Sequence, residues 1–344
     1  MFFIKLFISS FFMIICIGVA FDVSSLLTSN ILGPVNIDDN TKNNKNNFEE
    51  TKTNITKRKS EIKCNEYRNA VTEKVWLFHP SQSKPFSISI PCKQPINLLI
   101  SGGGPVESGQ FPHMAAIGWS DNDSNIQYFC GGSLISENWI LTAAHCTQYR
   151  LKRKPSVVRL GSNRLSDKMG EIIKIIDIIR HPEYKPPEMY SDIALLKLET
   201  SVIFRKNIRP ACLFSQIHKL PMAAWTTGWG QTESDEDKGS DDLLKVRLEI
   251  LDNVDCSLSY NKIPIIPDGI TSGMLCAGDL HSTGKKDTCK GDSGGPLQIL
   301  HPSYCLYELV GITSFGKLCG ILKYPSVYTS ISYYLEWIES IVWP

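Results

Sequence analysis

The run Gly-Asp-Ser-Gly-Gly-Pro at residues 291–296 constrains the fold and chemistry of this chain more than any other feature. Glycines on both sides of Ser293 let backbone approach a substrate closely and let neighbouring N–H groups point at one oxygen atom. A serine hydroxyl is a weak nucleophile by itself, so it needs a base and a group that orients the base. The run therefore predicts catalysis only if the chain supplies both.

Two upstream segments supply those groups. His145 lies in Thr-Ala-Ala-His-Cys at 142–146, and Asp192 opens the apolar run that follows Ser191. Taken singly, such residues are more often a core histidine and a turn aspartate. The chain order His, Asp, Ser matches one known triad solution and excludes the subtilisin and α/β-hydrolase orders. Three segments in this order predict a nucleophilic site formed by His145, Asp192 and Ser293.

Beyond residue 100 the chain consists of short apolar runs separated by Gly, Pro, Asn and Asp, as at 132–135, 139–141 and 309–313. This pattern is typical of an all-β barrel or sandwich. Near the end, four apolar residues have the i, i+3, i+4, i+7 spacing of an amphipathic helix. They are Tyr334, Trp337, Ile338 and Ile341.

On these motifs, residues 100–344 resemble a chymotrypsin-family, trypsin-like serine protease. The resemblance implies an all-β fold of two antiparallel β-barrels, with the active site in the cleft between them and a C-terminal helix. It implies that Ser293 is the nucleophile, His145 the general base and Asp192 the group that orients the base. The backbone N–H groups of Gly291 and Ser293 would form the oxyanion hole.

The resemblance also places the substrate pocket. Asp287, six positions before Ser293, stands where trypsin-like members keep an acid that binds arginine or lysine. Ser314 and Gly316 align with the segment that pairs with substrate backbone and leaves the pocket entrance open. Ser326 is a departure, because trypsin-like enzymes have glycine there and the extra hydroxymethyl group narrows the wall.

Activation is expected between Leu99 and Ile100, because Ile-Ser-Gly-Gly resembles the family's new N-terminus. The carboxylate of Asp292 would then pair with the α-amino group of Ile100. A pocket containing Asp287 binds leucine poorly, because its carboxylate would be buried without a partner. The zymogen is therefore expected not to activate itself and to need an upstream protease that cuts after leucine.

The N-terminal part divides into three predicted segments. Residues 1–20 carry one lysine, an apolar stretch and a small-residue end, which indicates a secretory signal peptide and a secreted protein. Residues 21–62 form an Asn- and Lys-rich propeptide that is expected to be disordered. Residues 63–99 form a linker, or light chain, before the catalytic domain at 100–344. Asn54 and Asn122 lie in glycosylation sequons.

Eleven cysteines in a secreted chain indicate disulfides rather than thiol chemistry. Cys16 would leave with the signal peptide. The resemblance implies the bridges Cys130–Cys146, Cys256–Cys276, Cys289–Cys319 and Cys92–Cys212. After these four bridges only Cys64 and Cys305 remain, and the even number of cysteines suggests that they pair with each other. The alternative is that they are free thiols or form a bridge to another protein.

Composition limits the partners. A net charge of +1 gives no electrostatic case for nucleic acid or an anionic membrane. The family's calcium loop lacks its first acid at 160–163, so neither a metal nor a cofactor is expected. Expected partners are protein substrates, an upstream activating protease and serpin inhibitors.

The segments at 111–116 and 313–317, with the Leu99 junction, resemble the snake- and persephone-like proteases of arthropod haemolymph. That resemblance implies a place in a Toll- or melanisation-type cascade, with a downstream protease zymogen as substrate. The chain has too few cysteines for the clip domain that such proteases usually carry. A venom or digestive trypsin-like protease and a non-catalytic protease homologue that only binds are the alternatives.

Overall fold

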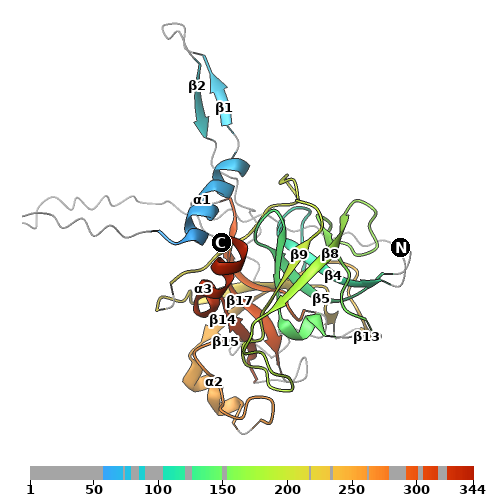
Figure 1. Ribbon diagram of the computed structural model, residues 1–344, viewed down its shortest axis with the longest axis vertical. Helices are drawn as coiled ribbons and strands as arrows, with labels where there is room; N and C mark the ends of the chain where they lie inside the picture. The colour runs from blue at the N-terminus through green and yellow to red at the C-terminus, as the bar shows by residue number, and fades with distance from the viewer. Residues whose placement is uncertain are drawn as a thin grey trace, which may run out of the picture. The chain divides into compact units, whose positions relative to one another are not determined.

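The computed structural model describes residues 57–72, 74–78, 85–89, 104–120, 126–148, 153–216, 218–232, 235–261, 263–278, 292–300, 305–316 and 324–344 (Figure 1). All of them belong to one compact unit, residues 55–344. Some residues predicted to be functional lie outside the described residues, namely Asn54, Cys92, Leu99, Ile100, Asn122, Asp287, Cys289, Gly291 and Cys319.

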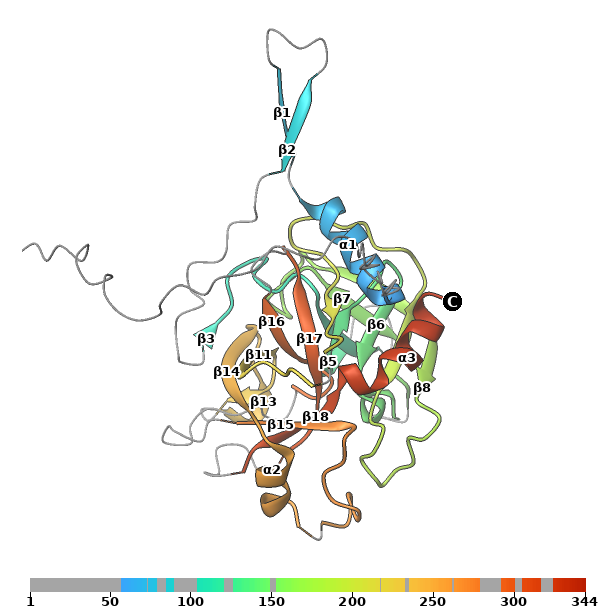
Figure 2. The same ribbon diagram turned by 90° about the vertical axis from the view of Figure 1, so that its left-hand side faces the viewer.

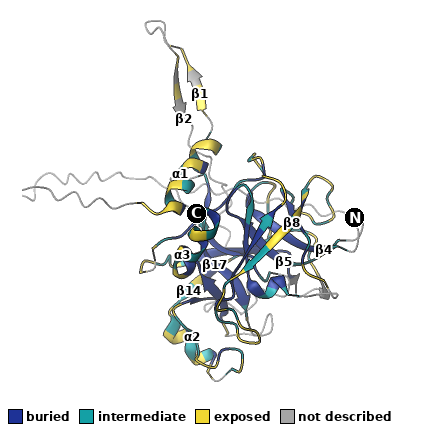
Figure 3. Cartoon of the chain, in the orientation of Figure 1, coloured by how far each residue is buried: buried dark blue, intermediate teal, exposed yellow. Residues whose placement is uncertain are grey.

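The first half of the catalytic region forms a closed barrel of six antiparallel strands in the order β4-β5-β6-β9-β8-β7. The strands are β4 (Met114–Ser120), β5 (Ile126–Leu134), β6 (Trp139–Thr142), β7 (Val157–Leu160), β8 (Glu171–Arg180) and β9 (Ala194–Leu198). Apolar side chains such as Ile117, Ile140 and Leu195 fill its interior and are fully buried. Figure 3 shows that much of the central strands is buried.

The second half forms another ring of six antiparallel strands, in the order β16-β11-β14-β15-β18-β17, which the pairing of β17 with β16 closes. The strands are β11 (Ala223–Gly228), β14 (Leu244–Leu251), β15 (Met274–Gly278), β16 (Pro296–Leu300), β17 (Tyr307–Phe315) and β18 (Ser326–Ser330). The prediction of two antiparallel barrels is confirmed.

Short elements extend this frame. Strand β10 (Cys212–Leu213) pairs in parallel with β17, and β3 (Gly104–Pro105) pairs with β14. A hairpin of β12 (Gln231–Thr232) and β13 (Asp235–Gly239), a 3₁₀ helix η2 (Ala144–Thr147) and helix α2 (Asn253–Ser259) lie in the connections.

The C-terminal helix α3 (Ile331–Val342) confirms the amphipathic spacing. Tyr334 and Ile338 are buried, and Trp337 and Ile341 pack against the same core as the first barrel. The apolar face of this helix is therefore held by tertiary packing rather than by intrinsic helix propensity.

The N-terminal segment differs from the prediction. Helix α1 (Lys59–Val71) begins inside the range 21–62 predicted as disordered, and β1 (Lys74–Leu77) pairs with β2 (Phe86–Ser89) inside the predicted linker 63–99. The prediction from composition did not include this helix, because contacts with distant parts of the chain stabilise it. Helix α1 lies beside α3 (Figure 2), and Ser60 donates its N–H and its hydroxyl to Glu339 of α3, at 3.1 and 2.5 Å. Tertiary contacts of this kind override local composition.

Three disulfides join described cysteines. Cys130–Cys146 and Cys256–Cys276 are as predicted. The predicted pairs Cys92–Cys212 and Cys64–Cys305 are wrong, because Cys64 pairs with Cys212. The physical reason is that α1 lies against β10 and brings the two Cα atoms to 5.3 Å, a normal disulfide separation. Cys305 is also disulfide-bonded.

Candidate active site

Strand pairing brings His145 and Asp192 together. β6 and β9 are neighbours, and Thr142 at the end of β6 faces Ala194 at the start of β9. His145 follows β6 on η2, and Asp192 precedes β9 in a turn. Two residues 47 positions apart in sequence therefore meet at one edge of the first barrel.

The carboxylate of Asp192 holds His145 at two points. Oδ2 accepts a hydrogen bond from His145 Nδ1 at 2.7 Å, and Oδ1 accepts one from the His145 backbone N–H at 2.8 Å. With the proton on Nδ1, the Nε2 atom is left as the basic nitrogen. The geometry fixes both the ring orientation and the tautomer.

The second barrel also contacts Asp192. The hydroxyl of Ser314 on β17 donates to Asp192 Oδ2 at 2.5 Å, and the hydroxyl of Thr329 on β18 donates to the Asp192 backbone oxygen at 2.9 Å. Ser314 was predicted to bind substrate backbone, so this side-chain contact is an additional one. Thr329 was missed by sequence reasoning, because its separation of 137 residues from Asp192 carries no local signal.

Asp192 is completely buried but remains the charged partner. Burial by itself raises the pKa of its carboxyl group. The nearby His145 and the hydrogen bonds from His145 and Ser314 outweigh burial, so the pKa lies below its ordinary value. A carboxylate that stays ionised can stabilise a protonated imidazole.

The turn that carries Ser293 is anchored to both barrels. The backbone oxygen of Ser293 accepts from Gly131 N–H of β5 at 2.8 Å. Gly294 N–H donates to the Thr313 backbone oxygen of β17 at 2.8 Å. Gly294 has a φ of 76°, and a Cβ there would lie 2.2 Å from Thr142 Oγ1 and 2.6 Å from the Gly131 backbone oxygen. Only glycine fits at position 294, which is the physical reason that a glycine follows Ser293.

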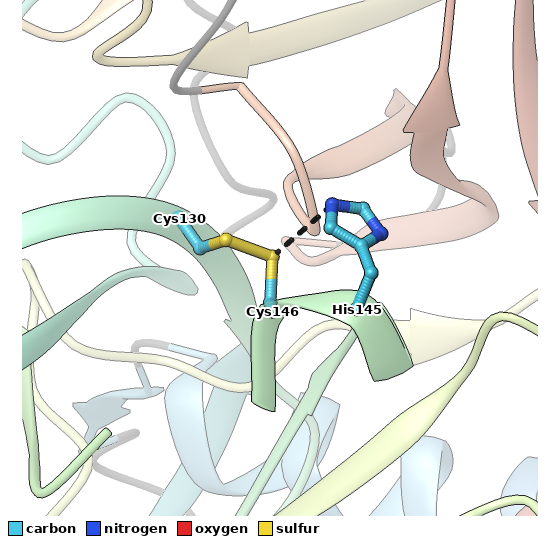
Figure 4. Close-up of side chains that lie close together, drawn as sticks. All are labelled: Cys130, His145 and Cys146. Carbon is cyan, nitrogen blue, oxygen red and sulfur yellow. Dashed lines mark hydrogen bonds between the residues drawn. A yellow bond between two sulfur atoms is a disulfide. The ribbon is translucent and has the colours of Figure 1, made fainter. Parts of the chain in front are cut away.

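The other imidazole nitrogen faces a disulfide. His145 Nε2 lies 3.7 Å from Cys146 Sγ, which is bonded to Cys130 (Figure 4). In the part of the chain that the structure describes, no hydrogen bond joins Nε2 to the Ser293 hydroxyl. Cys130, His145 and Cys146 are close enough to resemble a metal-binding group. Their sulfurs are used in the disulfide, however, and cannot act as thiolate ligands.

The carboxylate of Asp292 lies in a cradle made by two glycines. Its Oδ1 accepts from Gly230 N–H at 2.9 Å. A Cβ on Gly228 would lie 2.0 Å from the same oxygen, and one on Gly230 would lie 2.7 Å from the carboxylate. Sequence reasoning missed this cradle, although the Thr-Gly-Trp-Gly run at 227–230 was the available signal.

Part of the predicted substrate pocket is described. Ser326 is 1% exposed, and its hydroxyl oxygen lies only 3.0 Å from where a Cβ on Gly316 would be. Ser314, Gly316 and Ser326 therefore belong to one region of paired strands β17 and β18. Asp287 and Gly291 lie outside the described residues, so their roles stay predictions.

Two antiparallel barrels that bring a histidine, a buried aspartate and a glycine-flanked serine to their junction define the class of trypsin-like serine endopeptidases. The chain belongs to the trypsin family, since the family model for trypsin matches residues 100–338.

Curated relatives agree with this. The chain is 42% identical to Serine protease snk of Drosophila melanogaster over 83% of its own length and 66% of that protein. It is 35% identical to Serine protease Hayan of the same species, over 78% of the chain and 46% of that protein. It is 36% identical to Coagulation factor XI of Bos taurus, over 72% of the chain and 38% of that protein. The chain thus spans less than two thirds of the length of each of these relatives. No helix in the described ranges is long and apolar enough to cross a membrane.

Proposed function

We propose that this chain is the secreted zymogen of a serine endopeptidase that cleaves protein substrates after arginine or lysine. The observation that carries the proposal is the buried Asp192 carboxylate, hydrogen-bonded to the ring Nδ1 and the backbone N–H of His145 and to Ser314. A histidine oriented in this way has its Nε2 atom available to take a proton. Such a group serves as a general base for a neighbouring serine.

In the proposed mechanism the hydroxyl of Ser293 attacks the scissile carbonyl carbon, and its proton moves to His145 Nε2. The ionised Asp192 stabilises the imidazolium that forms. The N–H groups of Gly291 and Ser293 bind the negatively charged oxygen of the tetrahedral intermediate. Loss of one such donor typically raises the activation free energy by roughly 3–4 kcal/mol. The imidazolium then donates its proton to the leaving amine, and water repeats the sequence on the acyl-enzyme.

Activation is proposed to occur by cleavage between Leu99 and Ile100. The new amino group of Ile100 would then bind the Asp292 carboxylate. The cradle of Gly228 and Gly230 around that carboxylate supports this step, because it holds a partly buried carboxylate next to the Ser293 turn. A partly buried carboxylate is stabilised when an opposite charge is brought next to it, so the cleavage would favour the active conformation of the Ser293 turn.

Specificity for arginine and lysine rests on Asp287 and is modified by Ser326. Proteins similar to this chain include Serine protease snk and Serine protease Hayan, both of Drosophila melanogaster. This similarity supports a protein substrate, proposed to be a downstream protease zymogen in an extracellular cascade of the innate immune or developmental type. An upstream protease that cuts after leucine would activate the chain, and serpins would inhibit it.

The experiment uses the full chain with Leu99→Lys, cut with immobilised trypsin so that the new N-terminus is Ile100. The cut protein should hydrolyse arginyl and lysyl peptide substrates and be labelled at Ser293 by an organophosphate. Ser293→Ala should abolish both, whereas Ser340→Ala, an exposed serine on α3, should change neither. A cut protein that neither hydrolyses these peptides nor takes the label would instead be a protease homologue that only binds.

A further inference from the structure

Asp192 lies at the centre of a strained turn. Ser191 has a φ of 51°, and it is the one non-glycine residue with a positive φ in the ranges that the structure describes. The N–H of Ile193 donates to the Ser191 backbone oxygen at 2.8 Å, so the turn spans only three residues. A left-handed conformation is unfavourable for a non-glycine residue and persists only when the surrounding contacts enforce it.

The side chain of Ser191 is held by the C-terminal helix. Its Oγ accepts a hydrogen bond from the Tyr334 hydroxyl of α3 at 3.1 Å, and it donates to Glu183 Oε2 at 3.4 Å. Tyr334 is buried, and burial raises the pKa of its phenol. The phenol therefore stays protonated at neutral pH and can act as a hydrogen-bond donor.

Tyr334 itself has little freedom to move. Its ring packs edge-on against the ring of His181 at a centroid distance of 5.0 Å. The N–H of His181 donates to the backbone oxygen of Ile193 at 3.0 Å, so the same segment also holds the far side of the turn. A Cβ on Gly273 would lie 2.7 Å from the Tyr334 hydroxyl oxygen, so the phenol fills the space that this glycine leaves.

We propose that Tyr334 is a positioning residue for catalysis. Its hydroxyl holds Ser191 in the left-handed conformation and thereby keeps the Asp192 carboxylate aligned with His145. This inference rests on the proposed role of Asp192. Without the hydroxyl, Ser191 can relax toward ordinary backbone angles, and the adjacent Asp192 must rotate with it because the two share a peptide unit.

The test compares Tyr334→Phe with Tyr333→Phe in the activated full-length chain. Tyr333 neighbours Tyr334 on α3 but is 49% exposed, so its phenol is a matched control. Tyr334→Phe should lower kcat on the order of ten-fold with KM unchanged, since misaligned catalytic groups lose rate rather than binding. The acid limb of the kcat/KM profile should move to lower pH, because a displaced Asp192 stabilises the protonated imidazole less. Tyr333→Phe should leave both unchanged.

A second pair of variants tests whether the effect passes through Ser191. Glycine adopts left-handed angles without the Cβ penalty, so Ser191→Gly should retain most of the activity. In that background Tyr334→Phe should cost nothing further, which is the non-additivity expected of two residues that act on one turn. A merely structural role of Tyr334 would lower the thermal midpoint without moving the pH profile.

Three results separate the possibilities. If Tyr334→Phe matches Tyr333→Phe in kcat and in pH profile, the positioning role is wrong. If Tyr334→Phe costs as much in the Ser191→Gly background as it does alone, Tyr334 does not act through Ser191 and the inference is equally overturned. If Ser293→Ala and His145→Ala retain activity, the proposed function itself fails, which is a different outcome from either.

Discussion

Cys64 of helix α1 and Cys212 of β10 are joined by a disulfide that closes a sequence separation of 148 residues. The bridge ties the N-terminal segment to β10, the strand that pairs with β17 of the second barrel. Cleavage between Leu99 and Ile100 would therefore leave the N-terminal segment attached to the enzyme.

The first prediction concerns the remaining bridges. Cys305 is disulfide-bonded, and it cannot pair with Cys64 or Cys212. If Cys289 pairs with Cys319 as the family resemblance implies, Cys92 remains for Cys305. Non-reducing peptide mapping should therefore find a Cys92–Cys305 peptide pair, and Cys64→Ser with Cys212→Ser should still leave the cut chain as one species on a non-reducing gel. Release of the N-terminal segment from that double variant would contradict this pairing.

The docking of α1 on α3 should stabilise the protein measurably. Glu339→Ala removes the acceptor of two hydrogen bonds from Ser60, which is a buried residue. Leaving such groups without a partner should cost about 1–3 kcal/mol in the free energy of unfolding. Glu336→Ala, at an exposed position of the same helix, should cost much less. Urea unfolding of both variants makes the comparison, and equal losses would show that the α1 contact contributes nothing.

Gly294 should tolerate no side chain. Gly294→Ala would place a Cβ 2.2 Å from Thr142 Oγ1 at a φ of 76°, so the turn carrying Ser293 must shift. We expect a loss of kcat on the order of a hundred-fold, the scale of a displacement of about 1 Å at a reacting group. Gly269→Ala is the matched control, since Gly269 has the same φ but nothing within 4 Å of its added Cβ. It should show backbone strain alone, with kcat unchanged.

His113 should make the protein sensitive to acid. Its ring is 1% exposed beside Phe111 and Tyr307, and burial lowers its pKa from 6.5 to about 3. As pH falls below 6.5, His113 is protonated in the unfolded chain but stays neutral in the folded chain. The free energy of unfolding therefore declines by roughly 3–5 kcal/mol toward pH 3. His113→Gln should flatten this decline, measured as the slope of unfolding free energy between pH 6.5 and 4. His218→Gln, at an exposed histidine, should leave the slope as it is.

Ser326 should limit the primary pocket. Its buried hydroxyl lies beside Gly316, and trypsin-like enzymes have only a glycine hydrogen at the position of Ser326. Ser326→Gly should raise kcat/KM for arginyl and lysyl peptides on the order of ten-fold, the scale of one pocket group against a substrate side chain. Substrates with leucine at the cleaved position serve as the internal control and should gain little. An unchanged or lower value for arginyl peptides would mean that Ser326 does not narrow the pocket.

Much of the chemistry could be predicted from the sequence because it depends on local requirements. The two glycines after Ser293 form a recognisable run, because Gly294 needs a positive φ and both Gly294 and Gly295 allow close backbone approach. The barrel strands alternate with turn residues, and α3 carries its 3.6-residue apolar spacing in a single segment. His145 and Asp192 could be proposed as partners because their segments were recognisable separately.

Only the tertiary structure decided which distant groups meet. Three contacts each join residues more than a hundred positions apart. They are the disulfide Cys64–Cys212, the hydrogen bond from Thr329 to Asp192 and the hydrogen bond from Tyr334 to Ser191. Helix α1 also belongs here, since its buried Ser60 and Tyr67 find their partners on α3 and at Trp343. Local propensity carries no information on such contacts, because their free energy comes from packing and hydrogen bonds that exist only after the barrels and helices have come together.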